Sequence, residues 1–126
     1  MENNPDLSRS EVIKLIAFSY RPVTLGGVNL QGLNLSGLHF LGTNLQGANL
    51  QGANLEGANL QGANLQRANL RGANLQSANL QSANLQSANL EGAKLQKANL
   101  RGANVTGANL TDANRSGANL SDMIGY

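Results

Sequence analysis

The residues that could take part in catalysis are few and widely spaced. The chain of 126 residues contains no cysteine and a single histidine, His39. The absence of cysteine excludes disulfides, thiolate metal sites and thiol nucleophiles. A histidine without nearby carboxylates or thiols lacks the partners of a general base or a metal ligand. We therefore assign no catalytic role to His39.

The carboxylates and serines do not form a reactive group either. Four acids are well separated along the chain: Glu56, Glu91, Asp112 and Asp122. None forms the close carboxylate pair that acid–base chemistry or a hard cation needs. The serines at positions 77, 82 and 87 have no base beside them. We therefore predict that the protein is not an enzyme and has no catalytic residue, metal site or cofactor.

Positive charge gathers in one loose cluster, which we take as the candidate interaction patch: Arg67, Arg71, Lys94, Lys97 and Arg101. In the polygonal fold predicted below these residues fall on different sides, and the alternative is that they are solubilising surface charge. Nucleic-acid binding needs a continuous basic stripe with aromatic side chains for stacking. The net charge is only +2, and the chain has no Trp, two Phe and two Tyr. We therefore expect no nucleic-acid partner.

No segment predicts a membrane span or a signal peptide. The longest apolar cluster, residues 12–18, is interrupted by Lys14 and is too short to cross a bilayer. Residues 1–6 lack the basic start and apolar run of a signal peptide. We expect a cytoplasmic protein with no membrane partner.

The elements that position these side chains follow from a five-residue repeat between residues 25 and 120. Leucine is central in most units, alanine stands two residues before it, asparagine lies between them, and glycine or polar residues follow. A period of five fits neither the 3.6 residues of an α-helical turn nor the two-residue period of a long strand. It fits a short extended piece followed by a corner. Alanine and leucine then point inward and asparagine points outward.

Corner chemistry divides the units into two sets. In most units glycine, such as Gly52, takes the third place of the turn, where a type II turn needs a positive φ. Other residues take that place in several further units, among them Arg67, Ser77, Ser82, Ser87 and Lys97. Since such residues resist a positive φ, we predict type I-like turns at their corners.

The recurring Ala-Asn-Leu-x-x pattern over residues 21–122 resembles the pentapeptide-repeat family, in particular its small cyanobacterial-type members. The resemblance implies an all-β solenoid, a right-handed quadrilateral parallel β-helix with four units per coil and about five coils. We expect residues 1–20 to form an N-terminal arm and capping helix, residues 21–122 the β-helix, and residues 123–126 a C-terminal tail.

The resemblance leaves two classes of function, and the preferred one is a non-catalytic structural or protein-interaction scaffold. The alternative is a DNA mimic that interacts with gyrase, which is known in the family and requires an acidic surface. Residues 21–120 contain three acids against seven bases. The long C-terminal dimerisation element of such mimics has no counterpart in this sequence. Ice-binding solenoids favour threonine columns, and threonine is rare here.

Residues twenty apart should stack from coil to coil. This spacing predicts an ion pair between Arg71 and Glu91, and amide ladders in columns such as Asn49, Asn69, Asn89 and Asn109. It also predicts continuous leucine stacks, one of which begins with Phe40.

Both ends of the stack should differ from its middle. The capping-box spacing of Ser8 and Glu11 predicts a helix over about residues 9–18, lying across the base of the first coil. At the other end Arg115 occupies an inward position, where an unpaired guanidinium is too costly to bury. We expect the last coil to flare or Arg115 to leave through the open end, and we expect a monomer or a weak end-to-end dimer.

Overall fold

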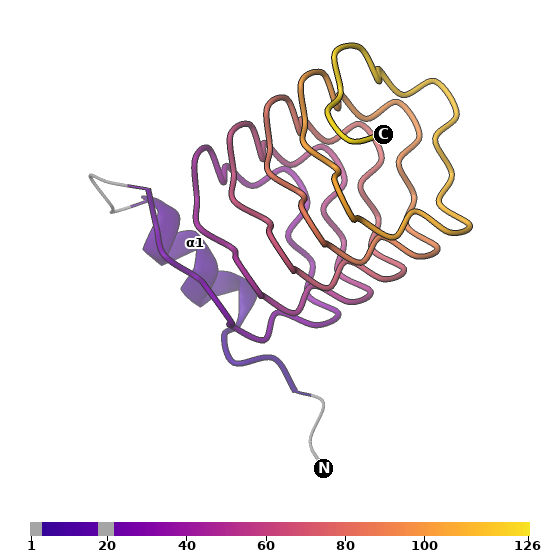
Figure 1. Ribbon diagram of the computed structural model, residues 1–126. Helices are drawn as coiled ribbons and strands as arrows, with labels where there is room; N and C mark the ends of the chain where they lie inside the picture. Colours follow the sequence, from indigo (N-terminus) through magenta and orange to yellow (C-terminus); the bar gives the residue numbers. More distant parts are fainter. Residues whose placement is uncertain (1–3, 18–21) are drawn as a thin grey trace.

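Parallel pairing at a constant offset of twenty residues organises the chain. The computed structural model describes residues 4–17 and 22–126. Single bridged residues take the place of long strands, from Thr24 paired with Asn44 to Asn104 paired with Ile124. Because paired residues are twenty apart and each unit has five residues, four units complete a coil. Successive coils stack as a four-sided solenoid (Figure 1).

Three backbone hydrogen bonds per unit hold neighbouring coils together. Leu70 N–H donates to the Asn89 carbonyl at 2.7 Å, and Gly72 N–H donates to the Glu91 carbonyl at 2.9 Å. Asn89 N–H in turn donates to the Ala68 carbonyl at 2.9 Å. This pattern repeats from coil to coil and satisfies buried polar backbone that water cannot reach.

The core consists of stacked leucines with small alanines between them. In one leucine stack, the members from Leu30 to Leu90 are fully buried, and Phe40 is buried at the start of its own stack, as predicted. Toward residue 126 Leu110 and Leu120 are only partly buried, because no coil of the described residues stacks on them.

The predicted type I-like turns at the corners without glycine are wrong. The five residues of the prediction have φ between 57° and 60°, as do Asp112 and Asp122: Arg67, Ser77, Ser82, Ser87 and Lys97. Ala78 N–H closes one of these turns onto the Leu75 carbonyl at 3.1 Å, and a positive φ at the third residue makes it type II. Ser77 N–H also donates to the Gln96 carbonyl of the next coil at 2.9 Å. The ladder therefore imposes one turn geometry on every corner and outweighs a strain of about 1 kcal/mol.

Helix α1 (Arg9–Ala17) precedes the solenoid and lies beside its first coil (Figure 1). The predicted capping box is confirmed: Glu11 N–H donates to Ser8 Oγ at 3.2 Å, and Ser8 N–H donates to Glu11 Oε1 at 3.0 Å. The backbone N–H of Ser8, followed by its hydroxyl, holds the pKa of Glu11 below its usual value. The helix ends at Ala17, and the rest of its predicted range, Phe18, lies outside the described residues.

Contacts join this N-terminal segment to the first coil. Val12 is fully buried, and Ile16 packs against the core cluster. Arg9 Nη1 donates to the Asn34 carbonyl at 2.6 Å, and Asn29 N–H donates to Asp6 Oδ2 at 2.8 Å. In the described part of the chain, no helix has the length and apolar character needed to span a membrane.

The positive φ angles of the corner serines lead to a prediction about stability. Replacing Ser82 (φ 58°) by glycine relieves backbone strain, and we expect the free energy of unfolding to rise by about 0.5–1 kcal/mol. The matched control is Gly62→Ala at the corner stacked on Ser82, where an added Cβ meets nothing within 4 Å. That substitution should lower stability by about 1 kcal/mol through backbone strain alone. Urea unfolding measures both, and an unchanged or lower midpoint for Ser82→Gly would contradict the assignment.

Candidate interaction surface

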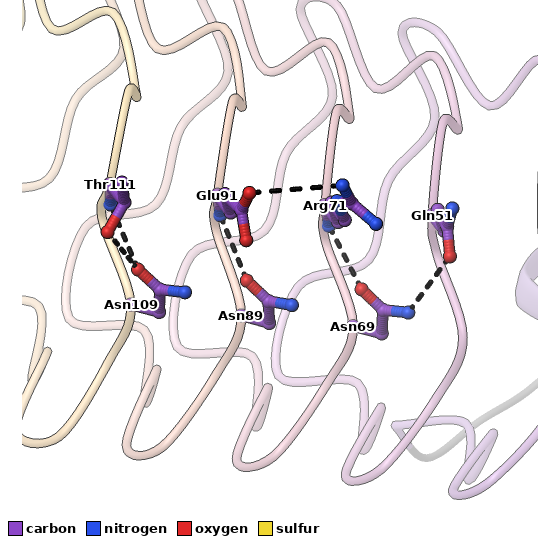
Figure 2. Close-up of polar contacts among 7 residues, drawn as sticks. All are labelled: Gln51, Asn69, Arg71, Asn89, Glu91, Asn109 and Thr111. Carbon is purple, nitrogen blue, oxygen red and sulfur yellow. Dashed lines mark hydrogen bonds and ion pairs between the residues drawn. The ribbon is translucent and has the colours of Figure 1, made fainter.

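The outward asparagines form the flat sides of the solenoid, and each is tied to its own corner. Asn69 Oδ1 accepts the N–H of Arg71 at 3.1 Å, and Asn89 Oδ1 accepts the N–H of Glu91 at 3.0 Å (Figure 2). The predicted asparagine-to-asparagine ladders do not form among the described residues. Instead, Asn69 Nδ2 donates to Gln51 Oε1 of the preceding coil at 3.2 Å (Figure 2). The amide oxygens are already engaged locally, so links between coils run from asparagine to glutamine.

The predicted ion pair between Arg71 and Glu91 is confirmed on this side of the molecule. Arg71 Nη2 lies 3.8 Å from Glu91 Oε1 (Figure 2). Their side chains are 58 % and 38 % exposed, so water screens the attraction. A second pair, Arg101 Nε to Asp122 Oδ2 at 3.6 Å, was missed. The spacing of twenty-one residues between its members was the signal that could have found it.

The structure separates most members of the candidate interaction patch. Arg67, Arg71, Lys97 and Arg101 stand at four different corners, because each follows a different leucine of its coil. Lys94 lies on the side between the corners of Arg71 and Lys97, and all five residues are exposed. Arg71 and Arg101 have acid partners from the next coil. Within the patch, Lys94 and Lys97 lie three residues apart in the same repeat unit.

Two shallow grooves run along corners of the solenoid, and sequence reasoning missed both. The first has a volume of about 320 Å³, and its lining residues are Gln46, Gln66, Arg67, Gln86, Ser87, Thr106 and Gly107. The second, which we call the corner groove, has a volume of about 230 Å³ and is lined by Glu56, Gln76, Ser77, Gln96 and Lys97. Glutamine recurring at intervals of twenty beside a corner was the available sequence signal.

His39 and the corner serines occupy ordinary places in the repeat. His39 is exposed at an outward position and pairs through its backbone with Asn59. Ser77, Ser82 and Ser87 are exposed corner residues. Within residues 4–17 and 22–126, no three His, Asp or Glu side chains lie close enough together to hold a metal ion.

Comparison with known proteins identifies the family. The family model described as pentapeptide repeats (8 copies) matches residues 25–62, 53–92 and 88–122. The chain belongs to the pentapeptide-repeat family. Pentapeptide-repeat relatives imply a right-handed quadrilateral β-helix for the four-sided stack described above. The sequence has no match among curated proteins.

Solved pentapeptide-repeat structures share the architecture. HetL of the cyanobacterium Nostoc, which is involved in regulating heterocyst differentiation, is 30 % identical with a TM-score of 0.72 over 82 % of this chain and 58 % of its own. A protein from the thylakoid lumen of Arabidopsis thaliana is 33 % identical with a TM-score of 0.72 over 74 % of this chain and 65 % of its own. Another Nostoc protein is 41 % identical, with a TM-score of 0.51 and 68 % of each chain covered. The chain thus spans about 60 % of the length of the first two.

The C-terminal end of this pentapeptide-repeat chain exposes Arg115, whose position in the repeat points inward. Its Nη1 donates to the Tyr126 hydroxyl, and its guanidinium lies 5.5 Å from the centre of the Tyr126 ring. Arg115 is therefore held outside the core, which avoids the cost of a buried unpaired charge. Ile124 and Tyr126 are also exposed beside this end.

The exposure of the Arg71–Glu91 pair predicts a small coupling energy. A double-mutant cycle with Arg71→Gln and Glu91→Gln should give about 0.5 kcal/mol at low salt, measured by urea unfolding. The coupling should disappear at about 1 M salt, where the screening length is roughly 3 Å. The control cycle pairs Glu91→Gln with Arg67→Gln at a different corner and should give no coupling. Equal coupling in both cycles would mean that the pair is not specific.

Proposed function

We propose that this pentapeptide-repeat protein is a non-catalytic scaffold that binds a partner protein along its polar sides. One observation carries the proposal. Every asparagine of the repeat between residues 29 and 119 accepts the backbone N–H two residues further on, at 3.0 or 3.1 Å. The sides therefore present amide groups in a pre-organised, regular array.

Pre-organisation matters because association normally costs about 0.5–1.5 kcal/mol for each flexible side chain that it orders. The asparagines of this array are ordered before a partner arrives. Lys94 and Lys97 add a positive pair at the edge of one side, and charge at the rim of an interface chiefly accelerates encounter with an acidic partner. These features support a binding surface for an extended, polar face of another protein.

The proposed organisation has three parts. Residues 1–20 form an arm and a helix that caps the open base, residues 21–122 form about five coils, and residues 123–126 form a C-terminal tail. The burial of Val12 and the hydrogen bond from Arg9 to the Asn34 carbonyl support the capping role. Covering the first coil prevents its unpaired edge from pairing with other chains. The regulatory involvement of HetL supports an interaction role for a solenoid of this kind.

The binding role is tested by partner capture with charge-reversed variants. Intact protein should enrich one partner from cells of the source organism. Lys94→Glu combined with Lys97→Glu should weaken binding of the purified partner at least tenfold. Lys14→Glu, which reverses an exposed charge on α1, is the control and should bind normally. Undiminished affinity of the double variant would remove the candidate interaction patch from the interface, and the lack of any saturable partner would overturn the scaffold role.

We further propose that the protein is a monomer that associates weakly end to end. The partly buried Leu110 and Leu120, together with the exposed Ile124 and Tyr126, place apolar surface at the C-terminal end of the stack. Sedimentation equilibrium should give a mass that rises with concentration for the intact protein and stays monomeric for Ile124→Lys. Ile13→Lys on α1, at the opposite end, is the control and should behave like the intact protein. A constant monomer mass for the intact protein would contradict the weak dimer.

A further inference from the structure

The N-terminal segment bonds to the first coil at the positions where a preceding coil would bond. Asp6 N–H donates to the Asn29 carbonyl at 2.6 Å, and Asn29 N–H donates to Asp6 Oδ2 at 2.8 Å. Within the stack, the corresponding bonds run from Leu70 N–H to the Asn89 carbonyl and from Asn89 N–H to the Ala68 carbonyl. Asp6 therefore supplies one donor and one acceptor in place of the backbone of a repeat unit.

Arg9 does the same on the next side of the first coil. Its Nη1 donates to the Asn34 carbonyl at 2.6 Å, and its Nη2 donates to the Ser36 carbonyl at 3.4 Å. In the middle of the stack, the carbonyls in the same two columns accept the N–H groups of Leu75 and Ser77. One guanidinium thus replaces two backbone donors.

A side-chain bond of the repeat is imitated as well. Asn29 Nδ2 donates to the Asn4 carbonyl at 2.9 Å. Within the stack, the equivalent bond runs from Asn69 Nδ2 to Gln51 Oε1 of the preceding coil. Residues 4–12, which we call the cap segment, therefore take the place of a preceding coil on two of the four sides.

The last coil, residues 106–122, presents the backbone groups that the cap segment imitates, at the opposite end of the stack from α1 (Figure 1). Among the described residues, the N–H groups of Leu110, Arg115 and Gly117 have no backbone partner, and neither has the Ala108 carbonyl. The equivalent groups of every earlier coil bond to the coil that follows. The last coil thus offers the donors and the acceptor that the first coil of another copy would use.

We propose that copies of this chain can stack head to tail, the last coil of one on the first coil of the next, and that the cap segment holds this interface closed. The cap segment and a second copy compete for the same carbonyls of Asn29 and Asn34. The cap segment binds preferentially, because attachment to the same chain gives it an effective concentration in roughly the millimolar range. This inference rests on the capping role proposed above for residues 1–20. It differs from the weak dimer, which joins two C-terminal ends.

A second copy stacked in this way continues the ladder without a change of register. Its Asn29 carbonyl accepts Leu110 N–H in place of Asp6 N–H, since paired residues are twenty apart along the whole stack. Its Phe40 lies on Leu120, which is only partly buried in a single copy. Backbone hydrogen bonds and apolar burial therefore both stabilise the stack once the cap segment has left.

Residues 123–126 cover a third side of the site, on the last coil. Ile124 pairs with Asn104 through the backbone. Gly125 packs so closely that an added Cβ would lie 2.6 Å from Thr106 Cα. Gly125→Ala therefore displaces this tail and clears its side for a second copy.

The test uses engineered cysteines, because the chain has none of its own. In the head-to-tail stack, Thr111 of one copy lies one inter-coil spacing, about 4.8 Å, from Gln31 of the next, and a disulfide can bridge that distance. Within one copy the two residues are four coils apart, so Gln31→Cys with Thr111→Cys forms no bond inside a monomer. Oxidation and non-reducing electrophoresis then report the stack as a series of covalent multimers.

This cysteine pair is compared in the intact background and in a release variant. The release variant frees both ends through four substitutions: Asp6→Ala, Arg9→Ala, Val12→Ser and Gly125→Ala. At about 0.1 mM protein we expect it to give about tenfold more multimer, because it removes a competitor at roughly millimolar effective concentration. Gln31→Cys with Ser121→Cys, which places the thiols at opposite corners, is the matched control and should give no series of multimers. Thr111→Cys alone should give at most a dimer.

Amide hydrogen exchange in dilute, reduced samples separates this inference from the capping role. The Asn29 amide should be protected in the intact protein and lose its protection in the release variant, while the Leu70 amide stays protected in both. An unprotected Asn29 amide in the intact protein would contradict the capping role itself. Loss of protection without multimers would overturn the head-to-tail interface alone.

A milder variant, Asp6→Ala with Arg9→Ala, decides the question if the release variant loses the Leu70 protection as well. It keeps Val12 and the tail in place and should give more multimer than the intact background. The head-to-tail interface is overturned if neither variant exceeds the intact background or if the opposite-corner control forms as many multimers. Asn29 protection that persists in both variants would overturn the role of the cap segment.

Discussion

A hydrogen bond from the N–H of each central residue to the carbonyl nineteen residues further along holds the solenoid together. It measures 2.6–2.8 Å at every central position from 25 to 105. Leucine and alanine alone would specify a core poorly, because few large residue types distinguish one packing from another. The ladder supplies the missing specificity, since it aligns identical side chains directly above each other. The leucine stacks and the flat asparagine sides are consequences of this register.

The same ladder explains the backbone at the corners. A serine or a lysine alone would avoid the left-handed region, yet Ser77 and Lys97 adopt it because their N–H groups must reach the next coil. A different turn at one corner would break the register of every coil beyond it. The strain at a few corners is therefore smaller than the cost of interrupting the stack.

The polar surface divides its hydrogen bonds between local and inter-coil partners. Each asparagine oxygen is used by its own corner, which leaves the amide nitrogen for a glutamine of the preceding coil, as with Asn69 and Gln51. Glutamine is longer and reaches along the axis, so Gln66 and Gln86 bond directly across one inter-coil spacing. This division orders the amide groups of the sides, and the glutamines that receive the inter-coil bonds stand at the corners. Both grooves lie there.

Four features could be predicted from the sequence: the five-residue period, the inward and outward positions, the capping box at Ser8 and Glu11, and the pairing of Arg71 with Glu91. Those features depend on residue type and on a spacing that can be counted along the chain. Tertiary structure alone decided the left-handed serine corners and the hydrogen bond from Arg115 to Tyr126. Each of these features depends on whether a group distant in the sequence is within hydrogen-bonding reach. A propensity calculated for one residue and its sequence neighbours does not contain that partner.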